Sequence, residues 1–361
     1  MDQKKSACRG CFLGLAVGDA MGYTVDDKTW EEICECYGPN GLMGYDLANG
    51  CAEVTSYTQV ASYVANALLL GVSRGKPGSY LAYITQGMRQ WAKRQHFPRD
   101  PEKNLFWVSQ VPELRRKNCR DARMLDAMRF DTLGTPERPI NNAATPGSIL
   151  TGAVIGLFYD NRRLEISQIG NLTIQAVSLT HGDPESYLAA AALAYVIAGV
   201  IQEPEQHLKE HFMQAAEVID RQFRDRFPQA AQLCAKLKLA IGLSGNHALD
   251  PREGMEQLEC RSAGECLAGA MFACLASEED FDTAMITAVN HSGRSAAVGA
   301  IAGAILGARL TEDALPEFYL ESLEAAPALR VLAEDLAVGT PVSGLFDDDW
   351  DHKYVQGLPL L

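Results

Sequence analysis

The chain has 361 residues, of which 47% are hydrophobic and 22% charged. This composition is typical of a globular protein and excludes a disordered, collagen-like or coiled-coil chain. There are 32 Lys and Arg against 46 Asp and Glu, so the formal net charge is −14. A negative field of this size disfavours nucleic acid or an anionic membrane as the main partner and favours a basic protein.

The N-terminal segment argues against a secretory signal. Lys4 and Lys5 precede the apolar run Cys11–Val17, but Asp19 interrupts that run and no small-residue cleavage site follows. The ten cysteines are too few for a disulfide scaffold, so we expect reduced thiols. These features predict a cytoplasmic protein.

The dominant periodicity along the chain is helical. Apolar residues recur at steps of three or four, with polar residues elsewhere, and runs of alternating β-branched residues are almost absent. Prolines fall between the periodic segments, where helix breakers belong. The sequence therefore predicts an all-α bundle, with helices over residues 57–71, 80–93, 166–179, 186–201, 208–223, 264–275 and 281–289.

Two further segments, 10–22 and 296–308, are unusually rich in small residues. In the second, Gly299, Gly303 and Gly307 are spaced four apart, which places a ridge of small residues on one helix face. Such a ridge lets a neighbouring helix approach closely, so we expect this helix at the centre of the bundle. The apolar stretch 188–201 is shorter than the roughly 20 residues that span a bilayer and predicts a buried helix, with no membrane partner.

The chain shows no internal repeat and no Gly/Ser linker. We expect one domain over residues 5–340, followed by a solvated acidic tail over 341–361 that contains Asp347, Asp348, Asp349 and Asp351. The segment 96–145 is dense in Arg, Asp and Pro and predicts long surface loops that carry recognition.

Several blocks resemble, in order and spacing, those of the ADP-ribosylglycohydrolase family, which includes dinitrogenase reductase-activating glycohydrolase. They cover roughly residues 8–340, and they are GCFLGLAVGDAMG (10–22), CYGPNG (36–41), NN (141–142), LTHGDP (179–184) and AVNHSG (288–293) leading into GAIAGA (299–304). The resemblance implies an all-α fold, in agreement with the periodicity.

Active members of this family are similar in holding two Mg²⁺ ions with a Thr/Ser-Asp-Asp-Thr stretch and a later Asp-x-Asp-Ser/Thr stretch. Hard divalent cations need oxygen ligands, and carboxylates from two segments must converge to hold a metal pair against the ribose hydroxyls. The chain departs from the pattern at both stretches. The first reads Thr55-Ser56-Tyr57-Thr58, and the second reads Arg294-Ser295-Ala296-Ala297.

All four metal-binding carboxylates are therefore missing, and Arg294 adds a permanent cation where the family binds Mg²⁺. The resemblance predicts that the Mg²⁺ pair is lost and that no other cofactor replaces it. It predicts a degenerate site with no assigned catalytic residue and no metal ligand, formed by Thr55, Ser56, Tyr57, Arg294, Ala296 and Ala297.

Candidates for contact with a ligand or partner are the polar residues of the family blocks together with the new arginine: Asp19, Asn141, Asn142, His181 and Arg294. Most have two interpretations. Asp19 is either a surviving site carboxylate or a polar residue at a helix end. His181 either transfers a proton or lies in a turn that caps the next helix. Arg294 either binds an anion or pairs with a nearby acid, and Tyr57 either stacks on a ligand or plugs the cleft.

Three functions are consistent with these observations. The first is a catalytically degenerate hydrolase that acts by binding, such as an immunity protein that caps a basic ADP-ribosyltransferase toxin domain. The second is a reader that binds ADP-ribose without cleaving it. The third is a hydrolase that reverses ADP-ribosylation by a metal-independent route, which needs a new acid pair.

Overall fold

A computed structural model of the chain describes residues 2–74, 79–97, 106–159, 166–339 and 348–355. Within these ranges the regular structure is helical, with three isolated β-bridges and no strand. The predicted all-α fold is confirmed. The helices are α1 (Asp2–Tyr23), α2 (Trp30–Tyr37), α3 (Ser56–Ser73), α4 (Tyr80–His96), α5 (Ala122–Ala127), α6 (Leu150–Phe158), α7 (Ile166–Ser178), α8 (Pro184–Gln202), α9 (Leu208–Phe223), α10 (Gln229–Ser244), α11 (Pro251–Gln257), α12 (Ala263–Ala276), α13 (Phe281–Val289), α14 (Ser295–Leu310), α15 (Glu317–Ser322), α16 (Ala326–Val338) and α17 (Asp348–Tyr354).

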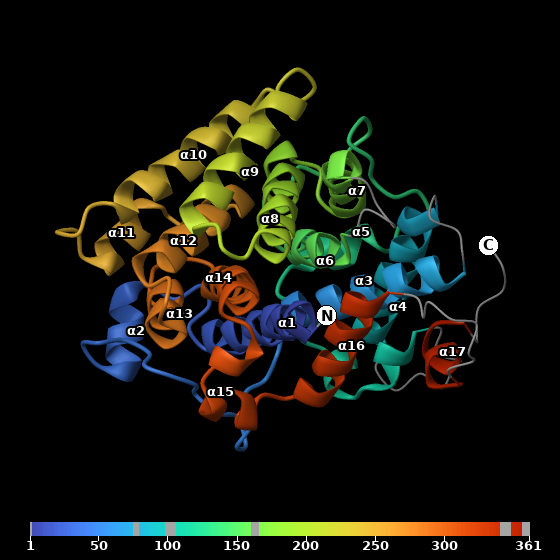
Figure 1. The fold of residues 1–361 in the computed structure, drawn as a ribbon, viewed down its shortest axis with the longest axis horizontal. Helices are drawn as coiled ribbons and strands as arrows, with labels where there is room; N and C mark the ends of the chain where they lie inside the picture. The colour runs from blue at the N-terminus through green and yellow to red at the C-terminus, as the bar shows by residue number, and fades with distance from the viewer. Residues whose placement is uncertain (1, 75–78, 98–105, 160–165, 340–347, 356–361) are drawn as a thin grey trace.

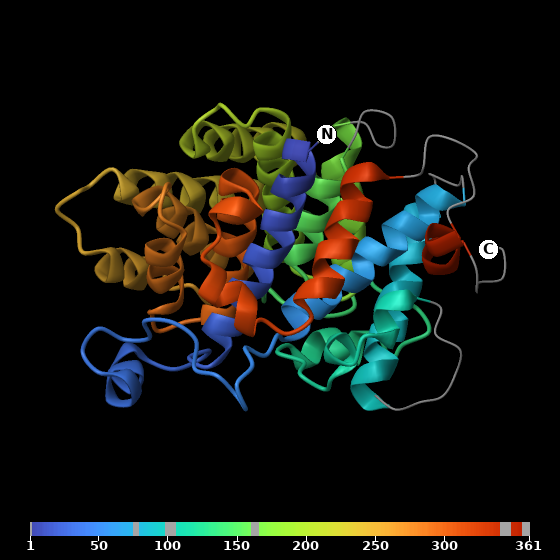
Figure 2. The same ribbon diagram turned by 60° about the horizontal axis from the view of Figure 1, so that its bottom comes forward.

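Helices α1 and α14 pack antiparallel at the centre of the molecule (Figures 1 and 2). Their glycines face each other, because a Cβ at Gly14 would lie 2.1 Å from the carbonyl oxygen of Gly303 and one at Gly18 would lie 1.9 Å from that of Gly299. The predicted close approach is confirmed, and the neighbour is the other small-residue segment. Residues 10–22 and 296–308 thus form one tight helix pair.

The other helices surround this pair. Helices α9 to α13 lie on one side, and α3, α4, α16 and α17 lie on the other (Figure 1). Helix α8 is long and apolar enough to cross a membrane by length and composition, but 72% of its apolar window is buried inside the molecule. It serves as a core helix that packs on α6, α7 and α9.

The helices that periodicity predicted lie within a few residues of their observed bounds, and it missed α2, α5, α6, α10, α11, α15, α16 and α17. Five of these have features that hide the period. Every residue of α6 is buried, so the helix has no polar face and shows no amphipathic period. Helices α5, α11, α15 and α17 have only six or seven residues, which is too short for a period to stand out.

The C-terminal segment differs from the solvated tail that we predicted. Asp347 lies outside the described residues, but residues 348–354 form α17, in which Trp350 and Tyr354 are buried. The indole of Trp350 donates to Ser73 Oγ over 3.0 Å, and the Tyr354 hydroxyl donates to Asp335 over 2.7 Å. The aromatic residues of this segment therefore dock on the body, while Asp348 and Asp349 stay exposed.

The segment 96–145 is irregular, as predicted, apart from two short 3-10 turns and α5. Residues 98–105 lie outside the described part of the chain. The end of this segment, from Asn118 to Asp121, contacts the start of α3, and it therefore takes part in the site described next.

Candidate functional site

The two stretches that correspond to the metal-binding motifs begin two different helices. Thr55 is the N-cap of α3 and Arg294 the N-cap of α14. The tertiary structure brings both helix starts against the loop that follows α1. The backbone N–H of Ala296 donates to Asp26 Oδ1 over 3.2 Å, and Ser56 Oγ accepts from the N–H of Arg120, whose guanidinium also reaches Asp26.

Asp19 holds the first turn of α3 from the neighbouring helix α1. Its carboxylate is fully buried and accepts four hydrogen bonds, from the backbone N–H and the hydroxyl of both Thr55 and Thr58, over 2.6 to 3.1 Å. Burial raises the pKa of Asp19 to about 6, although these hydrogen bonds favour the charged form. Within the described residues Asp19 therefore acts as a distant cap that fixes the start of α3 relative to α1.

Two arginines and two aspartates form what we call the arginine–aspartate cluster. Arg120 donates to Asp26 Oδ2 through Nε at 3.0 Å and through Nη2 at 2.7 Å, and its Nη2 lies 3.8 Å from Asp27. Arg294 donates to both carboxylate oxygens of Asp27 over 3.1 Å and to the carbonyl oxygen of Arg120 over 3.1 Å. Arg294 therefore pairs with a nearby acid, and that acid is Asp27.

Burial makes this cluster electrostatically tight. The side chain of Asp26 is fully buried, and this desolvation raises its pKa, opposed by the positive charges of Arg120 and Arg294. Asp27 remains more than half exposed. Tyr57 is completely buried, and its hydroxyl faces the Arg294 guanidinium without a well-aligned hydrogen bond. Its ring plugs the interior at this position.

The donor set does not fit a pair of Mg²⁺ ions. The positions that carry carboxylates in active family members hold a hydroxyl, a phenol, a guanidinium and a methyl group at Ser56, Tyr57, Arg294 and Ala296. Ala297, at the hydroxyl position that ends the second stretch, is a buried methyl. The carboxylates of Asp26 and Asp27 are already paired with arginines. In the described part of the chain, no three or more His, Cys, Asp or Glu side chains are grouped so that they could hold a metal.

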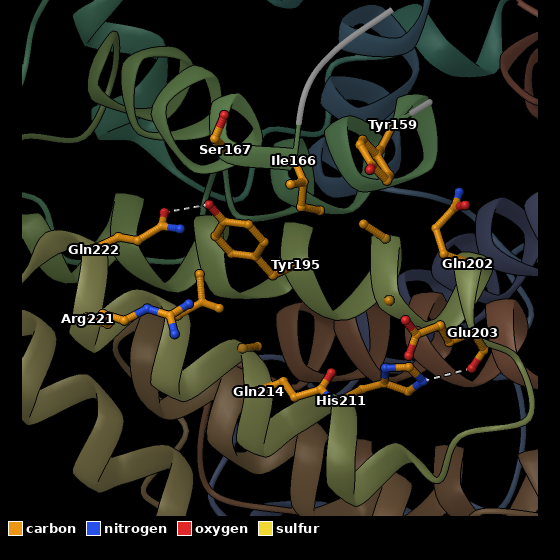
Figure 3. Close-up of a pocket in the computed structure, with 14 residues that line it drawn as sticks. Tyr159, Ile166, Ser167, Tyr195, Gln202, Glu203, His211, Gln214, Arg221 and Gln222 are labelled. Carbon is orange, nitrogen blue, oxygen red and sulfur yellow. Dashed lines mark hydrogen bonds between the residues drawn. The ribbon is translucent and has the colours of Figure 1, made fainter. Parts of the chain in front are cut away.

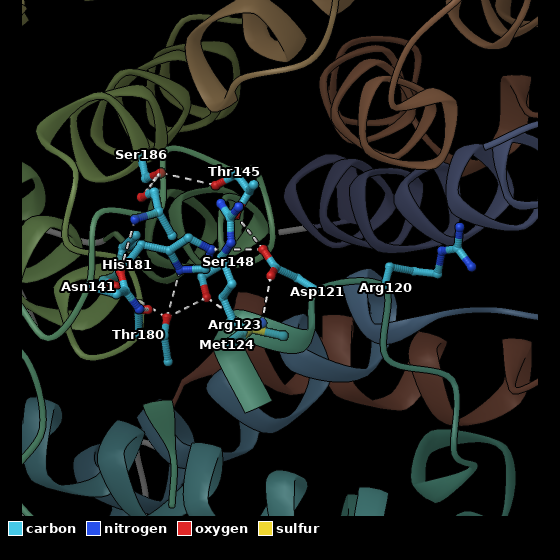
Figure 4. A network of polar contacts seen from close by, with 12 residues as sticks. Arg120, Asp121, Arg123, Met124, Asn141, Thr145, Ser148, Thr180, His181 and Ser186 are labelled. Carbon is cyan, nitrogen blue, oxygen red and sulfur yellow. Dashed lines mark hydrogen bonds and ion pairs between the residues drawn. The ribbon is translucent and has the colours of Figure 1, made fainter. Parts of the chain in front are cut away.

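A second polar network lies next to the cluster and begins at Asp121 (Figure 4). Asp121 caps α5 and accepts from Thr145 Oγ1, and its Oδ2 lies 3.2 Å from His181 Nε2. The other ring nitrogen of His181 lies 2.8 Å from Thr180 Oγ1, which is 2.9 Å from Ser148 Oγ.

His181 is fully buried in this network, and Asp121 is nearly so. Burial alone would raise the pKa of Asp121, but the hydrogen bond and charge of His181, with the donors Thr145 and the Arg123 N–H, lower it well below its usual range. The network joins the start of α5 to the turns before α6 and α8.

The paired asparagines have different environments. Asn141 accepts from the N–H groups of Ala143 and Gly182 and donates to the carbonyl oxygen of Thr180, so it fastens two loops together. Asn142 is exposed beside it. Asp183 caps α8 by accepting from the N–H of Glu185, as the helix-capping interpretation of this turn predicts.

Sequence reasoning missed four residues of the site. Asp26 and Asp27 follow directly after the opening helix block, and Arg120 and Asp121 lie in the irregular segment dense in Arg and Asp. Adjacent in sequence, Arg120 and Asp121 point to opposite sides, one into the arginine–aspartate cluster and the other into the network of His181 (Figure 4). From the sequence alone, the only signals were that Asp26 and Asp27 follow the opening block and that Arg120 and Asp121 lie in a segment rich in Arg and Asp.

Comparisons with known proteins agree with this architecture. A protein of Archaeoglobus fulgidus, described as uncharacterized, is 25% identical over 338 residues, which cover 91% of this chain and 95% of that protein. A solved structure described as an ADP-ribosylglycohydrolase-related protein complex has a TM-score of 0.57 and 20% identity, and the match covers 93% of this chain and 99% of that one. This likeness concerns the fold. The sequence model of ADP-ribosylglycohydrolase matches residues 1–344, and the chain therefore belongs to the ADP-ribosylglycohydrolase family.

Proposed function

We propose that this chain uses the ADP-ribosylglycohydrolase scaffold to bind a partner and does not carry out Mg²⁺-dependent hydrolysis. The observation that supports this function best is the arginine–aspartate cluster. Two guanidiniums, from Arg120 and Arg294, stand beside the two helix starts that in active relatives carry the metal ligands, and each is paired with an aspartate.

The charges of the cluster are balanced within the chain. A divalent cation that entered would meet two guanidiniums, and it would have to displace them from Asp26 and Asp27 before gaining any carboxylate ligand. Arg120 and the buried Asp26 form a charge-assisted pair with two hydrogen bonds, and removing Arg120 would leave a buried carboxylate without its counter-charge. In this cluster ion pairs hold together the segments that metal ions join in active relatives, so no cofactor is needed.

An acidic surface next to the cluster supports a protein partner. Residues 29–54 contain five acidic and no basic residues, and residues 311–325 also contain five acidic and no basic residues. These two segments pack together, since the ring of Tyr45 lies 5.0 Å from that of Tyr319 and the N–H of Ala52 donates to the carbonyl oxygen of Ser322. Figure 2 shows them along one face of the molecule.

This surface combines negative charge with exposed apolar groups. Met43 is 58% exposed and Phe318 is 57% exposed. Glu35 and Glu317 are exposed and form no ion pair within the described chain. Exposed apolar groups and unpaired carboxylates on the same segments fit a partner whose own surface is apolar and basic, because complementary charge speeds association and disfavours wrong partners.

The specific version of this proposal is an immunity protein that caps a basic ADP-ribosyltransferase domain. The family resemblance supplies the connection to ADP-ribosylation, and the acidic surface supplies the complementarity. Reading ADP-ribose is the second candidate, and one observation favours it. Arg294 Nε, the Tyr57 hydroxyl and Ser295 Oγ are buried without a hydrogen-bond partner, so they are available to a ligand if the cluster opens. Metal-independent hydrolysis ranks third, because the buried carboxylate Asp26 is already paired with Arg120.

A thermal-shift titration separates these candidates, because a ligand that binds the native state raises the melting temperature. We expect no change with ADP-ribose, MgCl₂ or EDTA, and an increase on adding a basic ADP-ribosyltransferase domain. That increase should shrink in Glu35→Lys and Glu317→Lys, whereas Glu217→Lys on α9 serves as a matched control. A shift by ADP-ribose that needs Mg²⁺ would contradict the proposal, and a Mg²⁺-independent shift lost in Arg294→Gln would replace it with the reader.

A further inference from the structure

A cavity of about 420 Å³ lies between α7, α8 and α9, away from the arginine–aspartate cluster (Figure 3). Its volume is within the range of small-molecule sites. Helix α8 carries Ser186, which bonds the loop of the first site, at one end and Gln202, which lines the cavity, at the other. Sixteen helical residues span about 24 Å, so the two sites are separate.

The cavity is a groove between two helices that present small residues to each other. Helix α8 contributes Tyr195, Ala198 and Gly199, and α9 contributes Ala215 and Val218. These positions follow one another at helical steps on the facing sides, and their short side chains leave the space between the helices open. The ring of Tyr195 forms an apolar wall of the groove, and the Tyr195 hydroxyl donates to Gln222 Oε1 over 3.0 Å (Figure 3).

The two ends of the groove carry opposite charges. Arg221 lies at one end and Glu203 at the other, beside His211 (Figure 3). Both charged side chains belong to exposed residues, and neither forms an ion pair with another described residue. His211 and Arg221 are ten residues apart on α9, which corresponds to about 15 Å along the helix.

The Glu203 end also holds a hydrogen-bond acceptor without a partner. His211 is 2% exposed, and its Nε2–H donates to the carbonyl oxygen of Glu203 over 3.2 Å, which leaves the lone pair on Nδ1. Nδ1 has no hydrogen-bond partner. It is buried against Gly199, where a Cβ would lie 2.7 Å away. The exposed carboxylate of Glu203 is the group at this end that attracts a cationic donor.

Three amide side chains also line the groove: Gln214 lies between its two ends, Gln202 beside Glu203 and Gln222 beside Arg221 (Figure 3). Each side-chain amide can donate and accept, as a peptide bond does. We propose that the groove binds a short apolar peptide with free termini, its ammonium group toward Glu203 and its carboxylate toward Arg221. An extended chain spans about 3.3–3.6 Å per residue, so about four residues fit a 15 Å groove.

Isothermal titration calorimetry with the full-length protein tests this site, with Ala-Leu-Leu-Ala as the probe. We expect binding by the peptide with free termini and a loss of about tenfold in affinity for the N-acetylated form and for the C-amidated form, because each modification removes one charge-assisted contact. Arg221→Gln should abolish the preference for the free carboxylate, and Glu203→Gln the preference for the free amine. Exposed neighbours that do not line the groove, in Arg224→Gln and Glu205→Gln, are the matched controls.

Equal affinity for the three forms of the peptide would overturn the proposal, as would an absence of heat at millimolar peptide. Ala198→Leu provides an independent check, because it fills the groove without touching either charge. This variant should lose binding of all three forms while circular dichroism shows an unchanged helical content. Retained binding in Ala198→Leu would place the peptide elsewhere and contradict the assignment.

Discussion

At the scale of single residues, the site depends on carboxylates that hold the starts of two helices. Asp19 accepts four hydrogen bonds from the first turn of α3, and Asp26 accepts from the N–H of Ala296 in the first turn of α14. Both carboxylates come from α1 or the loop after it. They lie at the N-terminal ends of α3 and α14, where the helix dipole makes a negative charge favourable. Side chains of neighbouring segments thus fix the positions of both helix starts.

Asp19→Asn tests this role and its pH dependence. We expect the free energy of unfolding to fall by about 2 kcal/mol near neutral pH, because an amide replaces one acceptor oxygen and faces a donor. The pKa of Asp19 is raised to about 6 in the folded state, above its value in the unfolded chain. As the pH falls, the folded protein therefore binds this proton at a higher pH than the unfolded chain does, and this stabilises the fold. The contribution of Asp19 protonation to the free energy of unfolding is lost as the pH rises through about 6.

The consequence is a gap between wild type and Asp19→Asn that widens on acidification. Between about pH 7.5 and pH 5 the difference in unfolding free energy should grow by about 1 kcal/mol, since Asn does not titrate. Urea denaturation of both proteins at the two pH values measures it. A gap that narrows toward pH 5 would show that the folded protein favours the charged carboxylate.

At the scale of elements, the molecule is organised around the α1–α14 pair. Small residues bring the two backbones into contact, and this approach places the end of α1 beside the start of α14. Because Asp19 lies at that end of α1 and Asp26 in the loop that follows, the ridge of glycines determines where the site forms. The same contact explains why Gly10, Gly14 and Gly18 alternate with residues that face the core.

Gly14→Ala should therefore be severe. Its Cβ would lie 2.1 Å from the backbone oxygen of Gly303, and the clash can be relieved only by moving a helix. We expect a loss of about 3 kcal/mol or more in the free energy of unfolding. Gly242→Ala in α10 is the matched control, because nothing lies within 4 Å of the added Cβ. It should stabilise the protein by about 0.5–1 kcal/mol through helix propensity. Similar thermal denaturation of the two variants would refute the packing argument.

At the scale of the whole molecule, segments distant in sequence share one folded body. The cluster joins the loop after α1, the loop before α5 and the start of α14, and its pairs link residues 26 with 120 and 27 with 294. The C-terminal helix α17 closes the other side, where Lys353 and Tyr354 both bind Asp335 of α16. The chain is thus held together across its length by buried polar contacts as well as by its apolar core.

Trp350→Ala tests whether α17 belongs to this cooperative body. Removing the buried indole should cost about 3 kcal/mol, which corresponds to a fall of about 4 °C in the melting temperature for a chain of this size. His352→Ala changes an exposed residue of the same helix and should have little effect. Differential scanning calorimetry compares them, and an unchanged transition in Trp350→Ala would mean that α17 unfolds independently of the rest.

The sequence by itself determined the helical class, most helix positions and the tight glycine contact of residues 296–308, because each depends on the local spacing of residues. Only the tertiary structure decided what surrounds the two motif stretches at 55–58 and 294–297. Asp26, Asp27 and Arg120 carry no local signal for pairing with one another and with Arg294, since these contacts join residues up to 267 positions apart. The same holds for α17, whose acidic composition predicts a solvated tail until Trp350 and Tyr354 find a buried surface on other helices.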